Sequence, residues 1–114
     1  MAAKDIHWLT IGALADGYRS RQISPLEATK ALLERIERLD GRLHSYLTVT
    51  ADGALAAAKE AEKELRSGRD RGPLHGVPIG LKDLVDTRGV ATSAGTAIFR
   101  DRVPREDAGL VERV

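Results

Sequence analysis

Residues 77–81 form a short apolar run that carries a proline at its second position and a glycine at its fourth. Pro78 has no backbone N–H and Gly80 weakens a helix, so the run is excluded from a helix interior. Turn-forming residues bound the run, and its length suits a buried β-strand. Because proline cannot donate to a sheet, we expect Pro78 at the first position of the strand or at a sheet edge.

Lys82 follows this run directly, and apolar character resumes at Leu84 and Val85. Lysine is rarely fully buried unless its ammonium is paired. Two interpretations fit the spacing. In one, Lys82 ends the strand with its stem on the core and its ammonium in water. In the other, Lys82 is desolvated, which can lower a lysine pKa from about 10.4 by roughly 3 to 5 units, and acts as a general base. The spacing alone leaves both open.

The first helical pattern follows Thr10, which is a predicted N-cap. Apolar residues recur behind it at helical spacing, so we expect a short helix that runs to about Arg21. Two aromatic residues near this helix, Tyr18 and Trp8, are predicted to be packing residues rather than ligand contacts.

A second helix begins at residues 24–27, Ser-Pro-Leu-Glu, which form a capping box with proline at the tolerated first position. We expect Ile23 to act as its hydrophobic staple and residues 40–41, Asp-Gly, to end it. A third helix is predicted over about residues 52–67. Residues 43–49 alternate in polarity, which fits a short strand or an extended segment.

Residues 72–96 read GPLHGVPIGLKDLVDTRGVATSAGT. This block resembles the opening block of the amidase signature family, which are hydrolases of carboxylic amides with a serine nucleophile. The match lies in the G-P-L-H-G-V-P-I-x-x-K-D core, the D-T-x-G turn at residues 86–89 and T-S-A-G-T at residues 92–96. It continues through residues 102–108 and extends more loosely over almost the whole chain. The resemblance implies an α/β fold with a mixed sheet flanked by helices, of which this chain provides the N-terminal helices and first strands. Residues 1–114 are then the N-terminal part of a single amidase domain, which stops before the serine-containing segment.

In that family the lysine that matches Lys82 belongs to a Ser–cis-Ser–Lys triad. The resemblance implies that neutral Lys82 takes a proton, through the bridging serine, from the nucleophilic serine. Lys82 is therefore the one predicted catalytic residue. The implied reaction is hydrolysis of a small carboxylic amide by acyl transfer through serine. A close alternative is the glutamine-hydrolysing subunit of a tRNA-dependent amidotransferase, although Leu84 stands where those subunits commonly have asparagine.

The chain departs from the family pattern in its serines. Both family serines lie in a segment of the type G-G-S-S-G-G-S, which is absent from this sequence. Ser93 is the serine closest to Lys82 in the sequence, and we interpret it as a loop hydroxyl that satisfies local backbone groups. The apolar pattern of residues 106–114 stops after barely two helical turns. We therefore expect an N-terminal fragment without turnover of its own, and a non-catalytic fragment is the third functional alternative.

The amino-acid composition narrows the classes of function and binding partner that remain. The chain has no cysteine and a net charge of +1, so disulfides, thiolate metal sites and a strong attraction to nucleic acid are not expected. Its histidines are scattered, and we expect neither a metal nor a cofactor. It has no apolar run that could span a membrane and no signal sequence, which favours a cytoplasmic protein. The expected partner is a small-molecule amide, and association between copies through an exposed sheet edge is open.

Overall fold

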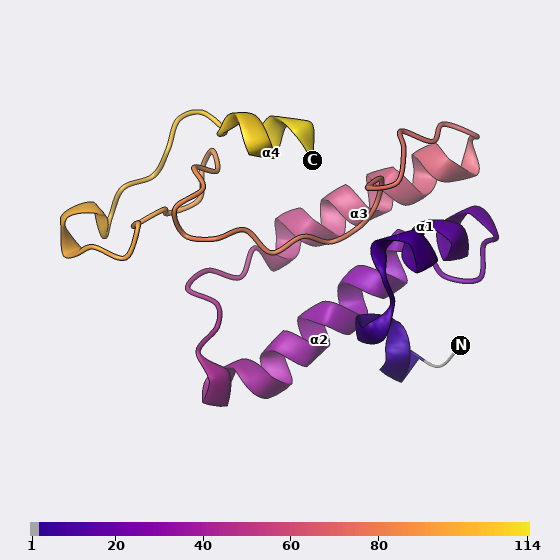
Figure 1. Cartoon of the computed structure of the whole chain (residues 1–114), viewed down its shortest axis with the longest axis horizontal. Helices are drawn as coiled ribbons and strands as arrows, with labels where there is room; N and C mark the ends of the chain where they lie inside the picture. Colours follow the sequence, from indigo (N-terminus) through magenta and orange to yellow (C-terminus); the bar gives the residue numbers. More distant parts are fainter. Residues whose placement is uncertain (1–2) are drawn as a thin grey trace. The chain divides into compact units, whose positions relative to one another are not determined.

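The computed structural model describes residues 3–114, which divide into two compact units. We call the first the helical unit; it runs up to Ser45 and resumes over Thr50–Pro78. The second, the loop unit, comprises Tyr46–Val49 and Ile79–Val114. Each unit is described by itself below (Figure 1).

The helical unit begins with the 3-10 helix η1 (Ala3–Trp8) and α1 (Ile11–Arg19). Thr10 caps α1 as predicted, because its hydroxyl accepts the backbone N–H of Ala13 at 3.1 Å. Tyr18 is buried, which confirms its packing role. The prediction for Trp8 was wrong: its side chain is 76% exposed and its ring contacts only that of His7, 4.9 Å away, among the ring pairs of the described residues.

The predicted capping box is present at the start of α2 (Pro25–Leu43). The Ser24 N–H donates to Glu27 Oε2 at 2.8 Å, and the Glu27 N–H donates to Ser24 Oγ at 3.1 Å. The helix continues past the predicted stop at residues 40–41. His44 takes the left-handed conformation that ends it, with φ at 50°, and Asp40 accepts the Ser45 N–H.

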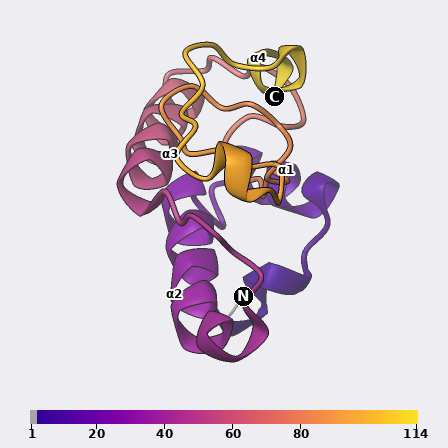
Figure 2. The same ribbon diagram turned by 90° about the vertical axis from the view of Figure 1, so that its left-hand side faces the viewer.

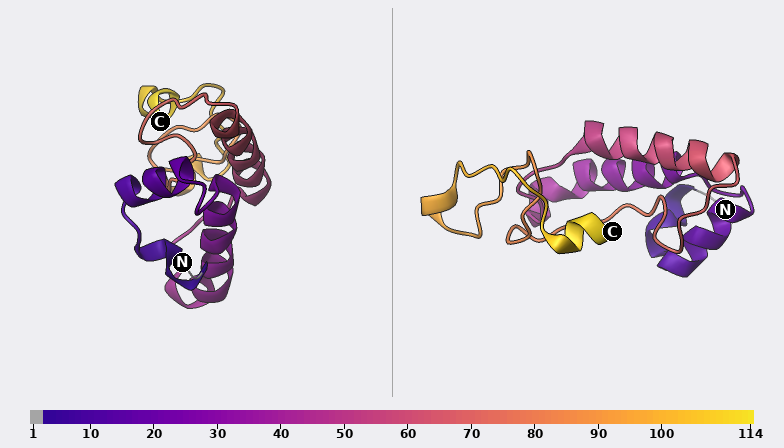
Figure 3. Two further views of the ribbon diagram at one scale, coloured as in Figure 1. Left: turned by 90° about the vertical axis from the view of Figure 1, so that its right-hand side faces the viewer. Right: turned by 90° about the horizontal axis from the view of Figure 1, so that it is seen from above.

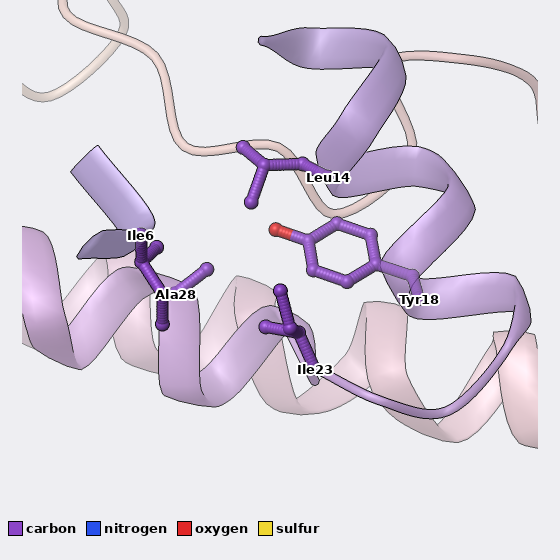
Figure 4. Close-up of a cluster of buried hydrophobic side chains, with 5 residues drawn as sticks. All are labelled: Ile6, Leu14, Tyr18, Ile23 and Ala28. Carbon is purple, nitrogen blue, oxygen red and sulfur yellow. The ribbon is translucent and has the colours of Figure 1, made fainter. Parts of the chain in front are cut away.

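Helix α3 (Ala51–Arg66) lies beside α2 and runs in the opposite direction (Figure 1 and Figure 3). The core of the helical unit is a small cluster of side chains, drawn in Figure 4. The cluster joins η1, α1 and α2 through Ile6, Leu14, Tyr18, Ile23 and Ala28. Val77 packs against it from the loop that follows α3, so the apolar run of residues 77–81 begins as part of this core.

Gly76 explains how closely that loop approaches α2. Its φ is +80°, and a Cβ at this position would lie 2.7 Å from Pro25 Cγ and 3.5 Å from the Ala61 Cβ. A side chain would therefore clash with Pro25 and also strain the backbone. Gly76 and Val77 of the sequence block thus pack within the helical unit.

The strand predicted at residues 77–81 and the strand alternative for residues 43–49 are wrong, and with them the α/β fold: no strand occurs within residues 3–114, whose regular elements are all helical. A strand exists only where a neighbour accepts and donates its backbone hydrogen bonds. Residues 43–49 are exposed, and around Val77 the backbone forms a turn, with the Val77 N–H donating to Leu74 O at 3.0 Å. The exposed sheet edge, which had left association between copies open, is therefore absent from the described residues.

The loop unit consists of irregular chain with two short helical turns, η2 (Ala97–Phe99) and α4 (Gly109–Arg113) (Figure 2). Three backbone hydrogen bonds join residues 86–92 to residues 102–108: Gly89 N to Pro104 O, Thr92 N to Arg102 O and Ala108 N to Asp86 O. Arg102 also forms a two-fold ion pair with Asp86, with N–O distances of 2.7 and 2.6 Å. Polar contacts of this kind take the place of a large apolar core in this unit.

Candidate functional site

Lys82 lies in the loop unit at the start of a turn, where its carbonyl oxygen accepts the Val85 N–H at 2.9 Å. Its side chain is exposed, as are those of Leu81 and Leu84 on either side of the Lys-Asp pair. No residue between 3 and 114 forms an ion pair or a hydrogen bond with the Lys82 ammonium. Within these residues the turn holds the backbone at Lys82, whereas the Lys82 ammonium has no hydrogen-bond or ion-pair partner.

Asp83 is the best-connected residue of this site. Its Oδ1 accepts the Ser93 N–H at 2.9 Å, and its Oδ2 accepts the Ser93 hydroxyl and, at 3.3 Å, the Gly95 N–H. Its carbonyl oxygen accepts the Ala94 N–H at 3.0 Å. One residue therefore binds three consecutive residues of the T-S-A-G-T segment. We call this arrangement, Asp83 with residues 93–95, the Asp83 clamp.

The clamp stabilises the charged form of Asp83. The Ser93 hydroxyl, followed by the Ser93 and Gly95 N–H groups, holds the pKa of the Asp83 carboxyl below its usual range. The backbone at Ala94 and Gly95 is left-handed, with φ at 52° and 71°, and it directs the Ser93 and Gly95 N–H groups to the Asp83 carboxylate and the Ala94 N–H to the Asp83 carbonyl oxygen. Because Asp83 already accepts these N–H groups, the turn has no donors left over for the oxyanion of a reaction.

The serines of the chain do not assemble a nucleophile with Lys82. The Ser93 hydroxyl accepts the Gly95 N–H at 3.3 Å, as expected of a loop hydroxyl, and it also donates to the Asp83 carboxylate. Ser20 and Ser67 donate to carbonyl oxygens at helix ends, and Ser24 caps α2. None of these hydroxyls bonds to the lysine that would activate it.

A second polar cluster lies in the helical unit around Glu64. Its Oε2 is 3.0 Å from Nε2 of His75, whose side chain is 7% exposed, and its Oε1 pairs with Arg71 and, at 3.3 Å, with Arg69. The pKa of Glu64 is lowered, chiefly by the hydrogen bond from Arg71. His75 Nδ1 accepts the Arg71 N–H at 3.1 Å, so the hydrogen-bond pattern assigns the proton to Nε2, which donates to Glu64.

This cluster changes how the sequence around it is understood. From the sequence alone, residues 66–72 are interpreted as a solvated basic loop and Glu64 as a residue that needs no partner beyond water. Instead, Glu64 organises the loop, and Asp70 accepts a hydrogen bond from Arg19 at 2.8 Å. Sequence reasoning missed both this cluster and the Asp83 clamp, because one charged side chain resembles another until its neighbours are known. The one available signal was that His75 and Asp83 fall inside the family-like block.

Among residues 3–114, no group of three or more histidine or acidic side chains is arranged to hold a metal ion. Likewise, none of the helices in the described part of the chain is long and apolar enough to cross a membrane.

Comparison with known proteins decides the family. A sequence model of the Amidase family matches residues 27–114, which is most of the chain. The chain belongs to the Amidase family. The match includes the segments that carry Glu64, Lys82 and the Asp83 clamp, so both polar clusters lie in the family-matched part of this amidase-family chain.

The relatives agree with this assignment. The chain is 48% identical over 106 residues to a protein named "Putative amidase AmiD" from Mycobacterium tuberculosis, covering 93% of this chain and 22% of that protein. It is 43% identical to a protein from Geobacter sulfurreducens that is named as a subunit of glutamyl-tRNA(Gln) amidotransferase, with the same coverage. The crystal structure of native peptide amidase from Stenotrophomonas maltophilia is similar over 90% of this chain and 21% of its own, with a TM-score of 0.84 and 37% identity. The amidase-family chain thus spans about a fifth of the length of these relatives.

Proposed function

We propose that this chain is the N-terminal part of an amidase domain and that Lys82 is the general base of that enzyme. The reaction is hydrolysis of the C–N bond of a small carboxylic amide. The observation that carries the proposal is the state of Lys82: its backbone is held by the Val85 turn and by the Asp83 clamp, while its ammonium has no partner within residues 3–114. A lysine placed in this way is available to a serine outside these residues.

The chemistry follows from the resemblance to the amidase signature family. Neutral Lys82 accepts the proton of a bridging serine, which in turn accepts the proton of the nucleophilic serine. The freed oxygen attacks the amide carbonyl, and the tetrahedral intermediate collapses to an acyl ester. The leaving amine takes up the proton that Lys82 had accepted. Water then attacks the ester, releases the acid and restores the serine.

The proposal places a condition on the surroundings of Lys82. A lysine acts as a base when neighbouring protein atoms desolvate its ammonium, because burial disfavours the charged form. Lys82 is exposed among the described residues, as are Leu81 and Leu84 beside it. Further protein surface must cover these side chains in the active enzyme. The relatives, of which this chain matches 22%, have the length to provide it.

The test is hydrolysis of a chromogenic aryl amide by the protein at its natural length. Lys82→Ala should lower kcat by roughly 10²- to 10⁴-fold, the usual contribution of general acid–base catalysis. Lys59→Ala is the matched control, because it removes the same charge from an exposed position on α3. A Lys82→Ala protein that hydrolyses the amide as fast as the Lys59→Ala control would refute the proposed role.

A second candidate function is supported by the relatives named as amidotransferase subunits, which are nearly as similar to this chain as the amidases. In that case the amide would be the side chain of glutamine, and the protein would act together with partner subunits. The two functions are separated by substrate: glutamine hydrolysis without turnover of an aryl amide favours the amidotransferase function. Absence of both activities favours the non-catalytic alternative.

A further inference from the structure

The Asp83 clamp and Lys82 share one peptide group. On the Lys82 side, the carbonyl oxygen of that peptide accepts the Val85 N–H. On the Asp83 side, the following carbonyl accepts the Ala94 N–H, and the carboxylate accepts three hydrogen bonds from residues 93–95. The main chain at Lys82 is therefore held from one direction by a local turn and from another by a segment about ten residues away.

The clamp also maintains an unfavourable backbone conformation. Ala94 is a non-glycine residue with φ at 52°, where its Cβ crowds the following carbonyl oxygen. Such conformations persist where the surrounding contacts over-determine them. Here those contacts are the hydrogen bonds to Asp83 on both sides of Ala94. Without a carboxylate at position 83, residues 93–95 lose the hydrogen bonds that hold them in this conformation.

We propose that Asp83 is a positioning residue: its carboxylate, held by residues 93–95, fixes the backbone from which Lys82 reaches the reacting serine. The inference rests on the proposed function of Lys82. Displacement of a catalytic group by about 1 Å can lower a rate on the order of 10²-fold without changing which groups are present. Asp83 therefore affects the chemical step through Lys82 and does not contact the substrate.

The structure predicts which substitutions weaken the clamp. Asp83→Asn keeps one acceptor oxygen for the Ser93 N–H but replaces the other with an amide nitrogen, which cannot accept from the Ser93 hydroxyl or the Gly95 N–H. Ser93→Ala is milder, since it removes the hydroxyl and leaves both backbone donors. Asp107→Asn is the control: it removes the same charge from the loop unit, and its remaining oxygen can still accept the Arg88 N–H that Asp107 binds.

The experiment measures kcat and KM of the protein at its natural length with a chromogenic aryl amide, and counts active sites by endpoint titration with a fluorophosphonate. Expressed per titrated site, kcat does not change when a variant merely contains fewer folded molecules. We expect Asp83→Asn to lower kcat per site by about 10- to 100-fold, with KM within about two-fold. Ser93→Ala should lower kcat per site by less, and Asp107→Asn should leave it within about two-fold.

The outcomes separate this inference from the proposed function. Full activity of Lys82→Ala refutes the proposed function itself. If Lys82→Ala is inactive while Asp83→Asn and Ser93→Ala keep the normal kcat per site, the positioning role is overturned. It is also overturned if Asp107→Asn loses as much as Asp83→Asn, since the loss then follows from charge alone. Should Asp83→Asn fail to fold, Ser93→Ala decides: an unchanged kcat per site refutes the positioning role, and a reduced one supports it.

Discussion

Tyr18 offers a sharp test of the core of the helical unit. Its side chain is 5% exposed, and its hydroxyl is buried without a hydrogen-bond partner in the described part of the chain. Figure 4 shows this hydroxyl pointing into the apolar cluster, beside Leu14. A buried hydroxyl that has given up its hydrogen bonds to water costs about 1 to 3 kcal/mol. Tyr18→Phe keeps the ring and removes the unpaired group.

We therefore expect Tyr18→Phe to raise the free energy of unfolding by about 1 kcal/mol, at the low end of that range, because local relaxation reduces the penalty. A change of this size corresponds to an increase in Tm of about 4 to 8 °C for a domain of 60 to 100 residues. Tyr18→Leu is the comparison variant. It also removes the hydroxyl but loses part of the ring volume, so it should be destabilising, as large-to-small core substitutions are.

The same burial predicts a dependence on pH. Desolvation raises the pKa of Tyr18 from 10.0 to about 12, so the folded state holds the phenolic proton more tightly than the unfolded state. The contribution of this proton to stability is complete below pH 10 and is lost as the pH rises toward 12, because the unfolded chain ionises first. The loss amounts to about 2 to 3 kcal/mol at about 1.4 kcal/mol per pH unit. Tyr18→Phe should lack it.

The assay is thermal unfolding followed by far-UV circular dichroism between pH 7 and pH 12, with both proteins compared at each pH. All other ionisable groups are the same in the two proteins, so the difference between the two curves isolates Tyr18. The advantage of Tyr18→Phe should widen above pH 10. A Tyr18→Phe protein that is less stable at pH 7, or that shows no widening, would mean that the hydroxyl has a partner and that the reasoning is wrong.

Two further predictions concern the helical unit. Gly76→Ala should destabilise the protein by more than about 1 kcal/mol, because the new methyl group would clash with Pro25 and the residue would keep a positive φ. Chemical denaturation measures the change in the free energy of unfolding. An unchanged value would contradict the close approach of Gly76 to Pro25. Glu64→Gln should make stability less sensitive to acid. The lowered pKa of Glu64 means that its contribution is present above its ordinary value of 4.5 and is lost as the pH falls through the folded-state pKa. Unfolding curves of equal acid sensitivity for the variant and the unsubstituted protein would contradict the pairing of Glu64 with His75 and Arg71.

The sequence predicted the features that are local in the chain. The caps at Thr10 and Ser24 were correct, because a capping hydroxyl binds a backbone N–H three residues away and needs no other part of the molecule. The burial of Tyr18 followed from helical periodicity. Family membership was equally accessible, since it depends on residue types in register over a single block, and the Amidase match bears it out.

Tertiary structure decided what depends on distant neighbours. The apolar runs have the composition of strands, but strands form only when another segment pairs with them, and none does so among residues 3–114. Asp83 and Glu64 are ordinary charged residues in the sequence, and their roles arise because folding brings Ser93 and His75 to them. Trp8 has the character of a core residue, yet η1 leaves it exposed. Contacts between residues that are close in the sequence can be predicted from the residue types alone. Contacts between residues that are far apart in the sequence depend on how the chain packs.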